Sequence, residues 1–504
     1  MPFKFEIYND GKRVMNFAPT AGMAMGPESV PIPGEVVFKD GMLVMNRHED
    51  QPAGVSLMWD IGEPGAFHLE TTRILPREKP YNLNVELARC RLMKIVQKQE
   101  DWNLFDFPHP RTEKQMARFR DAQATFAEAL GMLHEPMGAA RLADQAIIKS
   151  TDLADELALF HAELLLNRRR STNMFPKHVL GCRIDPTVQN QKYKETLLDN
   201  FDFAVLPMSW KILQPQEGSF QTEAVDEWVE LLTRRRMPII AGPLIDLTDG
   251  EVPEWMFIWE HDFDSLREIA YEYVQKVVQR YRKQISVWNV VSGLHTNSAF
   301  TLSFEQIIEL TRLLVAQVKA IQANARTLVT ITQPFGEYHS KGANSVPPML
   351  YAEMVAQAGI NFEAFGLEIE QGVPSRGGYM RDLFQLSCLM DRFSAIGRPV
   401  FLTALGCPGR YTPDPADRSE GKLDPAVGGR WKKPWDPTLQ ADWLETVCKM
   451  ALSKPFIESV AWANLSDGHT TLPAGGLLDD MLRPKPAFMK LQELRESFIR
   501  TRKA

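Results

Sequence analysis

The sequence predicts a TIM barrel, a closed (β/α)8 structure, behind an N-terminal β-sandwich-like domain and a helical connector. Two observations carry this prediction. From residue 178 onward, eight short apolar segments alternate with amphipathic helical segments, and this alternation is typical of a (β/α)8 barrel. Before residue 105, short segments of alternating polarity are separated by turn signals, as in a β-sandwich. The expected domains are residues 1–105, 106–175 and 176–504.

The N-terminal domain is predicted from its hairpin signals. Phe3–Tyr8 alternates with period two and ends at Asn9-Asp-Gly11, and a second Asp-Gly follows at Asp40-Gly41. Such dipeptides favour tight turns between antiparallel strands. Further strands are expected at Val55–Asp60 and Ala66–Thr72, with a helix near Leu83–Lys98. A β-sandwich beside a barrel suggests either a carbohydrate-binding module or a brace for the barrel, and both alternatives stay open.

The connector is predicted to be a pair of helices. Thr112-Glu-Lys-Gln115 has the spacing of a capping box, which marks a helix N-terminus. Apolar residues then recur at helical period as far as Leu130. Gly131 interrupts the pattern, and a second helix is expected at about Leu153–Asn167.

The barrel strands are predicted as short apolar segments separated by helices. They are expected at Val179–Ile184, Phe203–Leu206, Pro238–Ala241, Val287–Val291, Thr327–Ile331, Phe365–Ile369, Pro399–Thr403 and Ile457–Trp462. Helices of the outer ring are expected at Glu223–Arg235, Leu266–Gln284, Phe304–Gln322, Tyr351–Ala358 and Leu439–Ser453.

Motifs of the barrel segment resemble those of glycoside hydrolase family 10, the endo-1,4-β-xylanases. Trp210-Lys-Ile-Leu-Gln-Pro-Gln-Glu-Gly-Ser-Phe220 is similar to the family's W-x-x-L-E-P-x-x-G-x-F. Val252-Pro-Glu-Trp-Met256 is similar to its P-x-W, and Gly475–Phe488 to its closing L-L-F-D-x-x-x-x-P-K-P-A-Y. Because the matches occur in the family's order along residues 178–500, the resemblance implies the family's barrel and a carbohydrate ligand.

The same resemblance implies that both catalytic carboxylates of the family are missing. The family's W-D-V-V-N-E strand, which ends in the acid/base glutamate, corresponds to Val287-Trp-Asn-Val-Val-Ser-Gly293. Its T-E-L-D strand, which carries the nucleophile, corresponds to Phe401-Leu-Thr-Ala-Leu-Gly406. Gly293 and Ala404 therefore occupy the two catalytic positions. A retaining glycosidase needs two carboxyl groups about 5–5.5 Å apart, and neither residue supplies one.

Glu368 and Glu370 are the candidate catalytic residues for a relocated site. They are two apart on a predicted strand, so both side chains point to one face. Such positions lie about 6.6–7 Å apart, which overlaps the roughly 6.5–9.5 Å separation of inverting glycosidases. An inverting pair must flank the bond from opposite sides, however, so pairing with barrel arginines or binding of a sugar hydroxyl is the alternative role.

Residues expected to line the barrel mouth are the candidate substrate-binding residues. Aromatic rings stack on sugar faces, and polar groups that follow barrel strands lie where TIM barrels bind ligands. The candidates are Trp210, Trp255, Trp288, Trp462, His295, Glu337, Asp467 and His469. Their spacing matches no metal-binding motif, so no metal and no other cofactor is expected. Trp431 and Trp435 lie in a Gly/Pro-rich insertion at about residues 407–437, which is expected to cover the mouth as a lid.

Composition excludes several classes of protein. The 504 residues have a formal charge of −7 and no basic arm, so no nucleic-acid partner is expected. No stretch reaches the roughly 18 apolar residues of a membrane span, so no membrane partner is expected. Five scattered cysteines and the lack of a signal-peptide pattern favour a soluble, cytoplasmic protein, with an exported, processed form as the alternative. No particular protein partner is indicated.

Three functions follow from these observations. The first is a family-10-like carbohydrate-binding protein without the family's retaining xylanase activity. The second is an active glycosidase on a plant- or algal-type polysaccharide or oligosaccharide that uses Glu368 and Glu370. The third is a non-catalytic scaffold for protein contacts.

Overall fold

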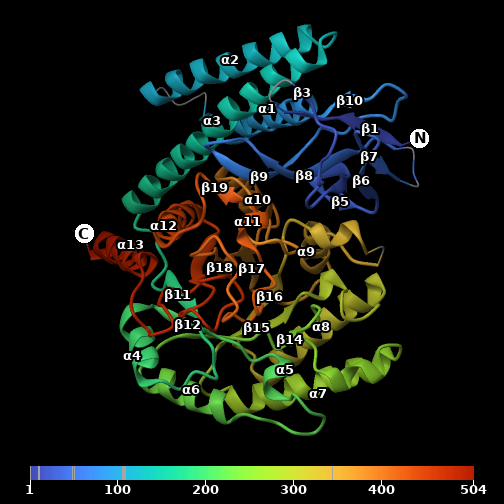
Figure 1. The fold of residues 1–504 in the computed structure, drawn as a ribbon. Coiled ribbons are helices and arrows are strands. Elements are labelled where there is room, and N and C mark those ends of the chain that lie inside the picture. Colours follow the sequence, from blue (N-terminus) through green and yellow to red (C-terminus); the bar gives the residue numbers. More distant parts are fainter. Residues whose placement is uncertain are drawn as a thin grey trace.

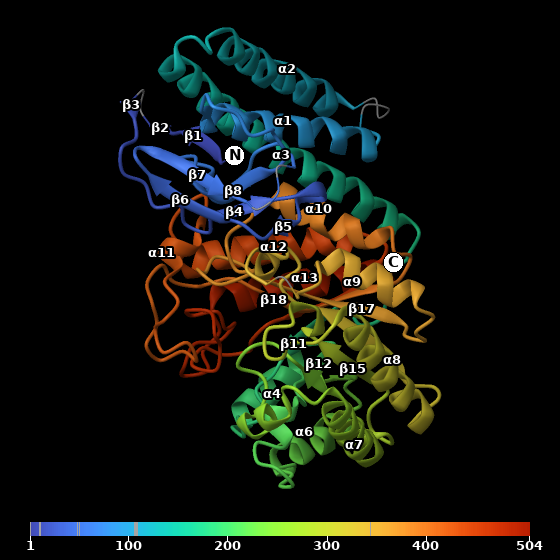
Figure 2. The same ribbon diagram turned by 90° about the vertical axis from the view of Figure 1, so that its right-hand side faces the viewer.

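The protein has an N-terminal β-domain, three helices beside it and a closed barrel below (Figure 1). The computed structural model describes residues 2–9, 12–47, 49, 51–104, 109–342 and 344–503. The N-terminal domain packs against one side of the barrel ring, next to α10 (Leu383–Ser394) and α11 (Pro425–Gly428) (Figures 1 and 2). None of the helices in these ranges combines the length and the apolar content that crossing a membrane requires. The predicted boundary at residue 105 lies outside the described residues.

Two main sheets form the N-terminal domain. One has the strand order β10-β1-β7-β6. The other has the order β19-β9-β8-β4-β5, in which β19 (Arg430–Trp431) comes from the barrel segment, and β2 pairs with β3. Their bounds are β1 Phe3–Glu6, β2 Tyr8–Asn9, β3 Lys12–Arg13, β4 Met23–Met25, β5 Pro31–Ile32, β6 Glu35–Lys39, β7 Met42–Asn46, β8 Gly54–Asp60, β9 Gly65–Glu70 and β10 Tyr81–Asn82. The Asp40-Gly41 hairpin is confirmed, and both turn residues have positive φ. Of the Asn9-Asp-Gly11 turn, Asp10 and Gly11 lie outside the described residues.

Three helices follow: α1 (Leu83–Asp101) and α3 (Pro136–Ser171) pack beside this domain, and α2 (Pro110–Gly131) packs on α3 and α1 as the outermost helix (Figure 1). The expected capping box at Thr112 is wrong, because the N-cap of α2 is His109 and Pro110 begins the helix. The second helix of the connector is much longer than predicted. Its first turns are rich in alanine and bury Ala139, Ala143 and Ala146, an apolar face that the sequence interpretation overlooked.

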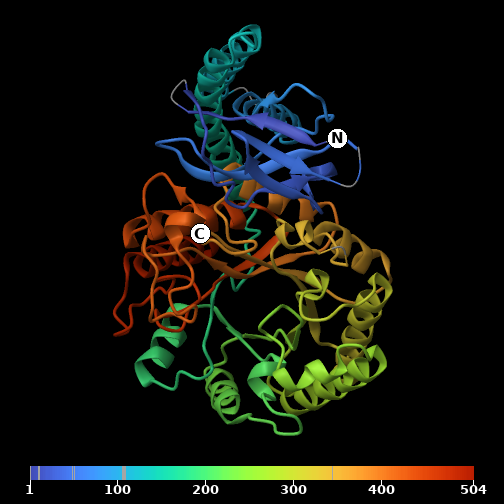
Figure 3. The same cartoon turned by 45° about the vertical axis from the view of Figure 1, so that its right-hand side comes forward.

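The barrel is confirmed as eight parallel strands in a closed ring (Figure 3). Its order is β13-β12-β11-β20-β18-β17-β16-β15, and pairing of β13 with β15 closes it. The bounds are β11 Leu180–Arg183, β12 Phe203–Leu206, β13 Ile239–Ala241, β15 Val287–Ser292, β16 Arg326–Ile331, β17 Ala364–Glu370, β18 Val400–Gly406 and β20 Ile457–Trp462. The short β14 (Ile245–Asp246) follows β13 and pairs with β15.

Helices surround this ring. The longer ones are α4 Gln191–Asn200, α6 Glu223–Arg234, α7 Phe263–Tyr281, α8 Phe304–Ile321, α9 Pro348–Gln357, α10 Leu383–Ser394, α12 Pro437–Ser453 and α13 Pro486–Lys503. The short ones are α5 Trp210–Leu213 and α11 Pro425–Gly428. A small apolar cluster that includes Phe203, Leu328 and Phe401 is separate from the main core. It lies on alternate strand positions that face the barrel interior.

The insertion at residues 407–437 joins the barrel to the N-terminal domain. Its strand β19 (Arg430–Trp431) pairs antiparallel with β9, with Trp431 opposite Gly65. Trp431 and Trp435 are buried, so the expectation that they cover the mouth is wrong. Backbone pairing with an edge strand fixes this part of the insertion at the domain junction.

Candidate functional site

The carboxyl ends of the barrel strands enclose two adjoining cavities of about 340 and 230 Å³. Glu368, Glu370, Thr332 and Thr471 line both of them. We call the two together the mouth. The other charged and polar residues of the larger cavity are Arg183, Asp185, Thr187, Ser209, Asp246, Thr248, Glu251, Arg418, Asn464 and His469. This end of a TIM barrel is where the fold presents ligand-binding groups.

Strand β17 directs both glutamates into the mouth. Phe365, Leu367 and Ile369 pack into the core around the barrel, so the alternate residues Glu368 and Glu370 face inward. Arg183, at the end of β11, lies between them. Its Nη2 is 3.1 Å from Glu370 Oε1, and its Nη1 is 3.9 Å from Glu368 Oε1. Burial raises the pKa of Glu368, and the Arg183 charge only partly opposes this shift.

Asp246 is the most perturbed carboxyl group of the mouth. It ends β14, and its Oδ1 accepts hydrogen bonds from Thr248 N (2.9 Å) and Thr248 Oγ1 (2.7 Å). Burial, together with the nearby charges of Glu251 and Glu368, raises the pKa of Asp246 to about 7. A carboxyl group in this state exchanges a proton near neutral pH.

A second polar group surrounds Asp185, which follows β11. Asp185 accepts from Thr187 Oγ1 (2.6 Å), forms an ion pair with Arg418, and lies 3.1 Å from His469 Nδ1. Burial alone would raise the pKa of Asp185, but the Thr187 hydrogen bonds and the Arg418 charge lower it below its usual value. His469 thus lies at the mouth, as predicted. Arg418 belongs to the 407–437 insertion, so this part of the insertion does reach the mouth.

The two positions at which the resemblance implied missing carboxylates lie beside other carboxylates. Gly293 has φ +69°, and a Cβ built there would be 2.3 Å from Thr248 Cγ2 and 3.0 Å from Asp246 Oδ1. Ala404 is fully buried on β18 and is the register partner of Glu368 on β17.

The four predicted tryptophans do not line either cavity of the mouth. Trp210, Trp288 and Trp462 are buried, and Trp255 is half-buried. Each indole Nε1 donates to a nearby protein oxygen: Trp210 and Trp255 to Gln214, Trp288 to Gln322, and Trp462 to Gly475. These rings pack within the fold, so the expected aromatic surface for a sugar is not formed by them.

Three predicted polar residues also lie away from the lining. His295 is buried, stacks on Tyr351, and is within 2.9 Å of Thr332 O through Nε2. Glu337 is buried, and its ion pair with Arg381 is 2.6 Å long. Asp467 is held by Lys485 at 3.2 Å and accepts from Gly476 N. The interactions of these three side chains are with other parts of the fold and need no ligand.

Sequence interpretation missed five important mouth residues: Arg183, Asp185, Ser209, Asp246 and Arg418. Arg183 ends the first barrel strand, Asp185 follows it and Asp246 follows the third, so strand-end position was a usable signal. Ser209 and Arg418 lie in loops whose path to the mouth the sequence does not reveal. Among the described residues, no group of three or more His, Cys, Asp or Glu side chains is arranged to hold a metal ion.

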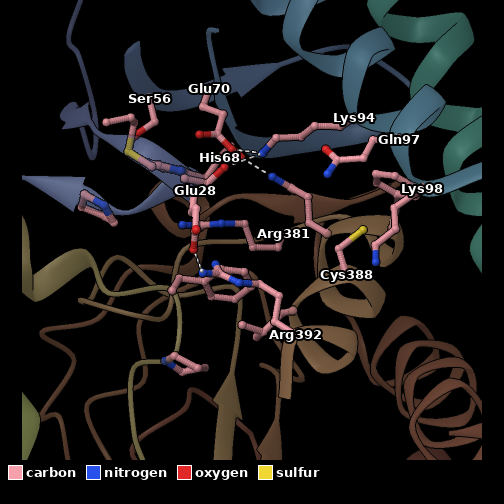
Figure 4. Close-up of a pocket in the computed structure, with 18 of the residues that line it drawn as sticks. Glu28, Ser56, His68, Glu70, Lys94, Gln97, Lys98, Arg381, Cys388 and Arg392 are labelled. Carbon is pink, nitrogen blue, oxygen red and sulfur yellow. Dashed lines mark hydrogen bonds and ion pairs between the residues drawn. The ribbon is translucent and has the colours of Figure 1, made fainter. Parts of the chain in front are cut away.

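Another cavity, of about 450 Å³, lies where the N-terminal domain meets the barrel. We call it the junction cavity. Figure 4 shows His68, Glu70 and Lys94 of the N-terminal domain facing Arg381 and Arg392 of the barrel. Lys94 forms an ion pair with Glu70, and burial lowers the pKa of Lys94 to about 8.

Comparisons with known proteins agree with the resemblance at low identity. Residues 171–308 match the model of glycosyl hydrolase family 10. Endo-1,4-beta-xylanase B of Thermotoga neapolitana is 20% identical over 331 residues, which cover 62% of this chain and 86% of that protein. Endo-1,4-beta-xylanase 2 of Aureobasidium pullulans is 21% identical over 308 residues, 58% of this chain and 78% of that protein.

Solved structures give matches of the same kind. Xylanase B from Clostridium stercorarium F9 aligns with a TM-score of 0.48 and 18% identity, covering 64% of this chain and 98% of that one. An intracellular xylanase from Thermoanaerobacterium saccharolyticum, a mutant in complex with xylotetraose, aligns with a TM-score of 0.46 and 15% identity, covering 64% of this chain and 96% of that one.

Proposed function

We propose that this chain is a divergent member of glycoside hydrolase family 10 that binds a neutral saccharide at the mouth, without the family's retaining reaction. The family-model match and the xylanase names of its relatives support the assignment. Many hydrogen-bonding groups in one concave site support a polyhydroxylated ligand.

The observation that carries the second half of the proposal is the environment of Gly293. Its left-handed φ favours glycine, and a side chain would collide with Thr248. Backbone conformation and space both disfavour a glutamate at this position, which supports the proposed loss of the acid/base residue. Ala404 has no functional group, so a covalent glycosyl–enzyme intermediate cannot form at that position.

Binding and chemistry are tested by two measurements. Thermal shift with xylotetraose, cellotetraose and mannotetraose is expected to show saturable stabilisation by at least one of them. Intact-mass analysis after incubation with a 2-fluoro-xyloside that labels retaining enzymes is expected to show no adduct. A covalent adduct would contradict the loss of the retaining reaction, and no shift with any of the three would contradict saccharide binding.

A further inference from the structure

The two mouth carboxylates Asp246 and Glu368 occupy related positions on the barrel. The family pattern places its carboxylates on the strands that are β15 and β18 here. The short β14 follows β13 and pairs with β15, so the neighbouring strands run in the order β14-β15-β16-β17-β18. Asp246 ends β14 and Glu368 lies on β17, so each is one strand away from a family position, in the same direction. The two carboxylates are therefore three strands apart, as are the two family positions.

Local contacts place each carboxylate next to the position that it would replace. Asp246 Oδ1 lies 3.0 Å from the site of a Cβ on Gly293. Glu368 is the register partner of Ala404 on the adjacent strand. Both side chains line the same cavity of about 340 Å³. The space at the two family positions is therefore bordered by carboxylates that come from neighbouring strands.

One residue of the cavity lining has a buried hydroxyl group without a partner in the described part of the chain. Ser209 lines the cavity and is only 4% exposed. Among the described residues its Oγ has no hydrogen-bond partner. A buried hydroxyl without a partner costs free energy, and a ligand that bonds to it recovers that cost.

We propose that Asp246 and Glu368 form a relocated acid–base pair that hydrolyses a glycosidic bond at the mouth. Asp246 donates its proton to the glycosidic oxygen as the C1–O bond breaks. Glu368 accepts a proton from the water whose oxygen bonds to C1. One water is consumed, two free hydroxyl groups are produced, and exchange with solvent restores both carboxyl groups. This single displacement needs no carboxylate at position 404.

The environment of Asp246 supports its role as the acid. Burial near Glu251 and Glu368 keeps a proton on Asp246 close to neutral pH, as a general acid requires. Glu370 is the closer partner of Arg183, so its carboxylate is held in an ion pair. This assignment differs from a Glu368/Glu370 pair on one strand, because Asp246 faces the mouth from another part of the ring.

The inference rests on the proposed saccharide binding, and one experiment separates the two. The full-length protein is incubated with each tetrasaccharide that gives a thermal shift, and products are measured by chromatography. The wild type is expected to cleave at least one. Asp246→Asn and Glu368→Gln are each expected to lower the rate about 100-fold or more, while the thermal shift with ligand stays. Glu370→Gln is expected to cost about tenfold or less.

Glu363→Gln is the matched control, because Glu363 immediately precedes β17 at the opposite end of the same strand. Its rate is expected to match the wild type. Binding without cleavage by the wild type would overturn the relocated pair and leave the binding proposal intact. A larger loss in Glu370→Gln than in Asp246→Asn would also overturn the pair. No binding at all would overturn the proposed function itself.

Discussion

The junction cavity and the mouth use ionisable side chains differently. At the junction, each of four cations has a carboxylate partner: Lys94–Glu70, Lys98–Asp101, Arg381–Glu337 and Arg392–Glu28. The larger mouth cavity is lined by five carboxylates, Asp185, Asp246, Glu251, Glu368 and Glu370, but by only two arginines, Arg183 and Arg418. Charge at the junction is neutralised within the protein, whereas the mouth keeps an excess of carboxylates for a ligand or a reaction.

The junction also differs from the mouth because it connects the N-terminal domain to the barrel. The barrel insertion adds β19 to a sheet of the N-terminal domain, and a buried ion pair joins Arg91 of α1 to Asp382, the N-cap of α10. These contacts join the N-terminal domain to the barrel. They also predict that mutations at the two regions have different consequences.

The largest expected effect is at the junction. Arg91 Nη1 is 2.8 Å from Asp382 Oδ2, and both side chains are almost fully buried. Arg91→Leu leaves a buried carboxylate without its partner, so we expect a loss of about 3–5 kcal/mol in the free energy of unfolding. Denaturant titration measures it. Arg430→Ala removes the partly exposed Asp60–Arg430 pair and should cost about 1 kcal/mol or less. Equal losses would show that burial does not matter here.

The next largest effect is expected from a side chain at Gly293, beside the mouth residue Thr248. Gly293→Glu combines a left-handed backbone with a collision at Thr248, and we expect it to lower stability by about 2–4 kcal/mol without creating retaining activity. Gly250→Glu is the control, since Gly250 also has positive φ but no atom lies within 4 Å of its would-be Cβ. It should cost about 1 kcal/mol. A stable Gly293→Glu variant would contradict the steric argument.

A pH effect is expected from Asp246. Its pKa in the folded protein is about 7, above the roughly 3.9 of an unfolded chain. The folded state therefore binds more protons between these values, and stability falls as pH rises from about 4 to 7. Asp246→Asn should flatten this part of the stability curve, measured by denaturant titration at several pH values. The same slope in both proteins would show that Asp246 is ionised in the folded state.

The smallest effect concerns the tryptophans. Trp288 is buried and bonds to Gln322, away from the lining of the mouth. Trp288→Phe should lose about 1 kcal/mol of stability with the hydrogen bond but change the dissociation constant of a bound tetrasaccharide less than twofold. Calorimetric titration measures the latter. A large loss of affinity would show that the Trp288 ring contributes to saccharide binding.

The fold was more predictable than the site. Each barrel strand is a local apolar segment such as Phe203–Leu206 or Ile457–Trp462, and the structure has both with these bounds. The placement of Glu368 and Glu370 followed from strand alternation. Trp431 pairs with β9 because that strand, distant in the sequence, offers a free sheet edge. No local sequence pattern near Trp431 encodes this pairing. Likewise, Asp246 lies beside Gly293 only because β14 pairs with β15.

Saccharide binding at the mouth is tested most directly by calorimetric titration of a stabilising tetrasaccharide into the wild type, Ser209→Ala and Ser292→Ala. Both serines are buried with an unpartnered hydroxyl among the described residues, but only Ser209 lines the mouth. Loss of one hydrogen bond should weaken binding by Ser209→Ala about 2- to 10-fold, while Ser292→Ala keeps the wild-type affinity. Equal affinity in all three proteins would contradict binding at the mouth.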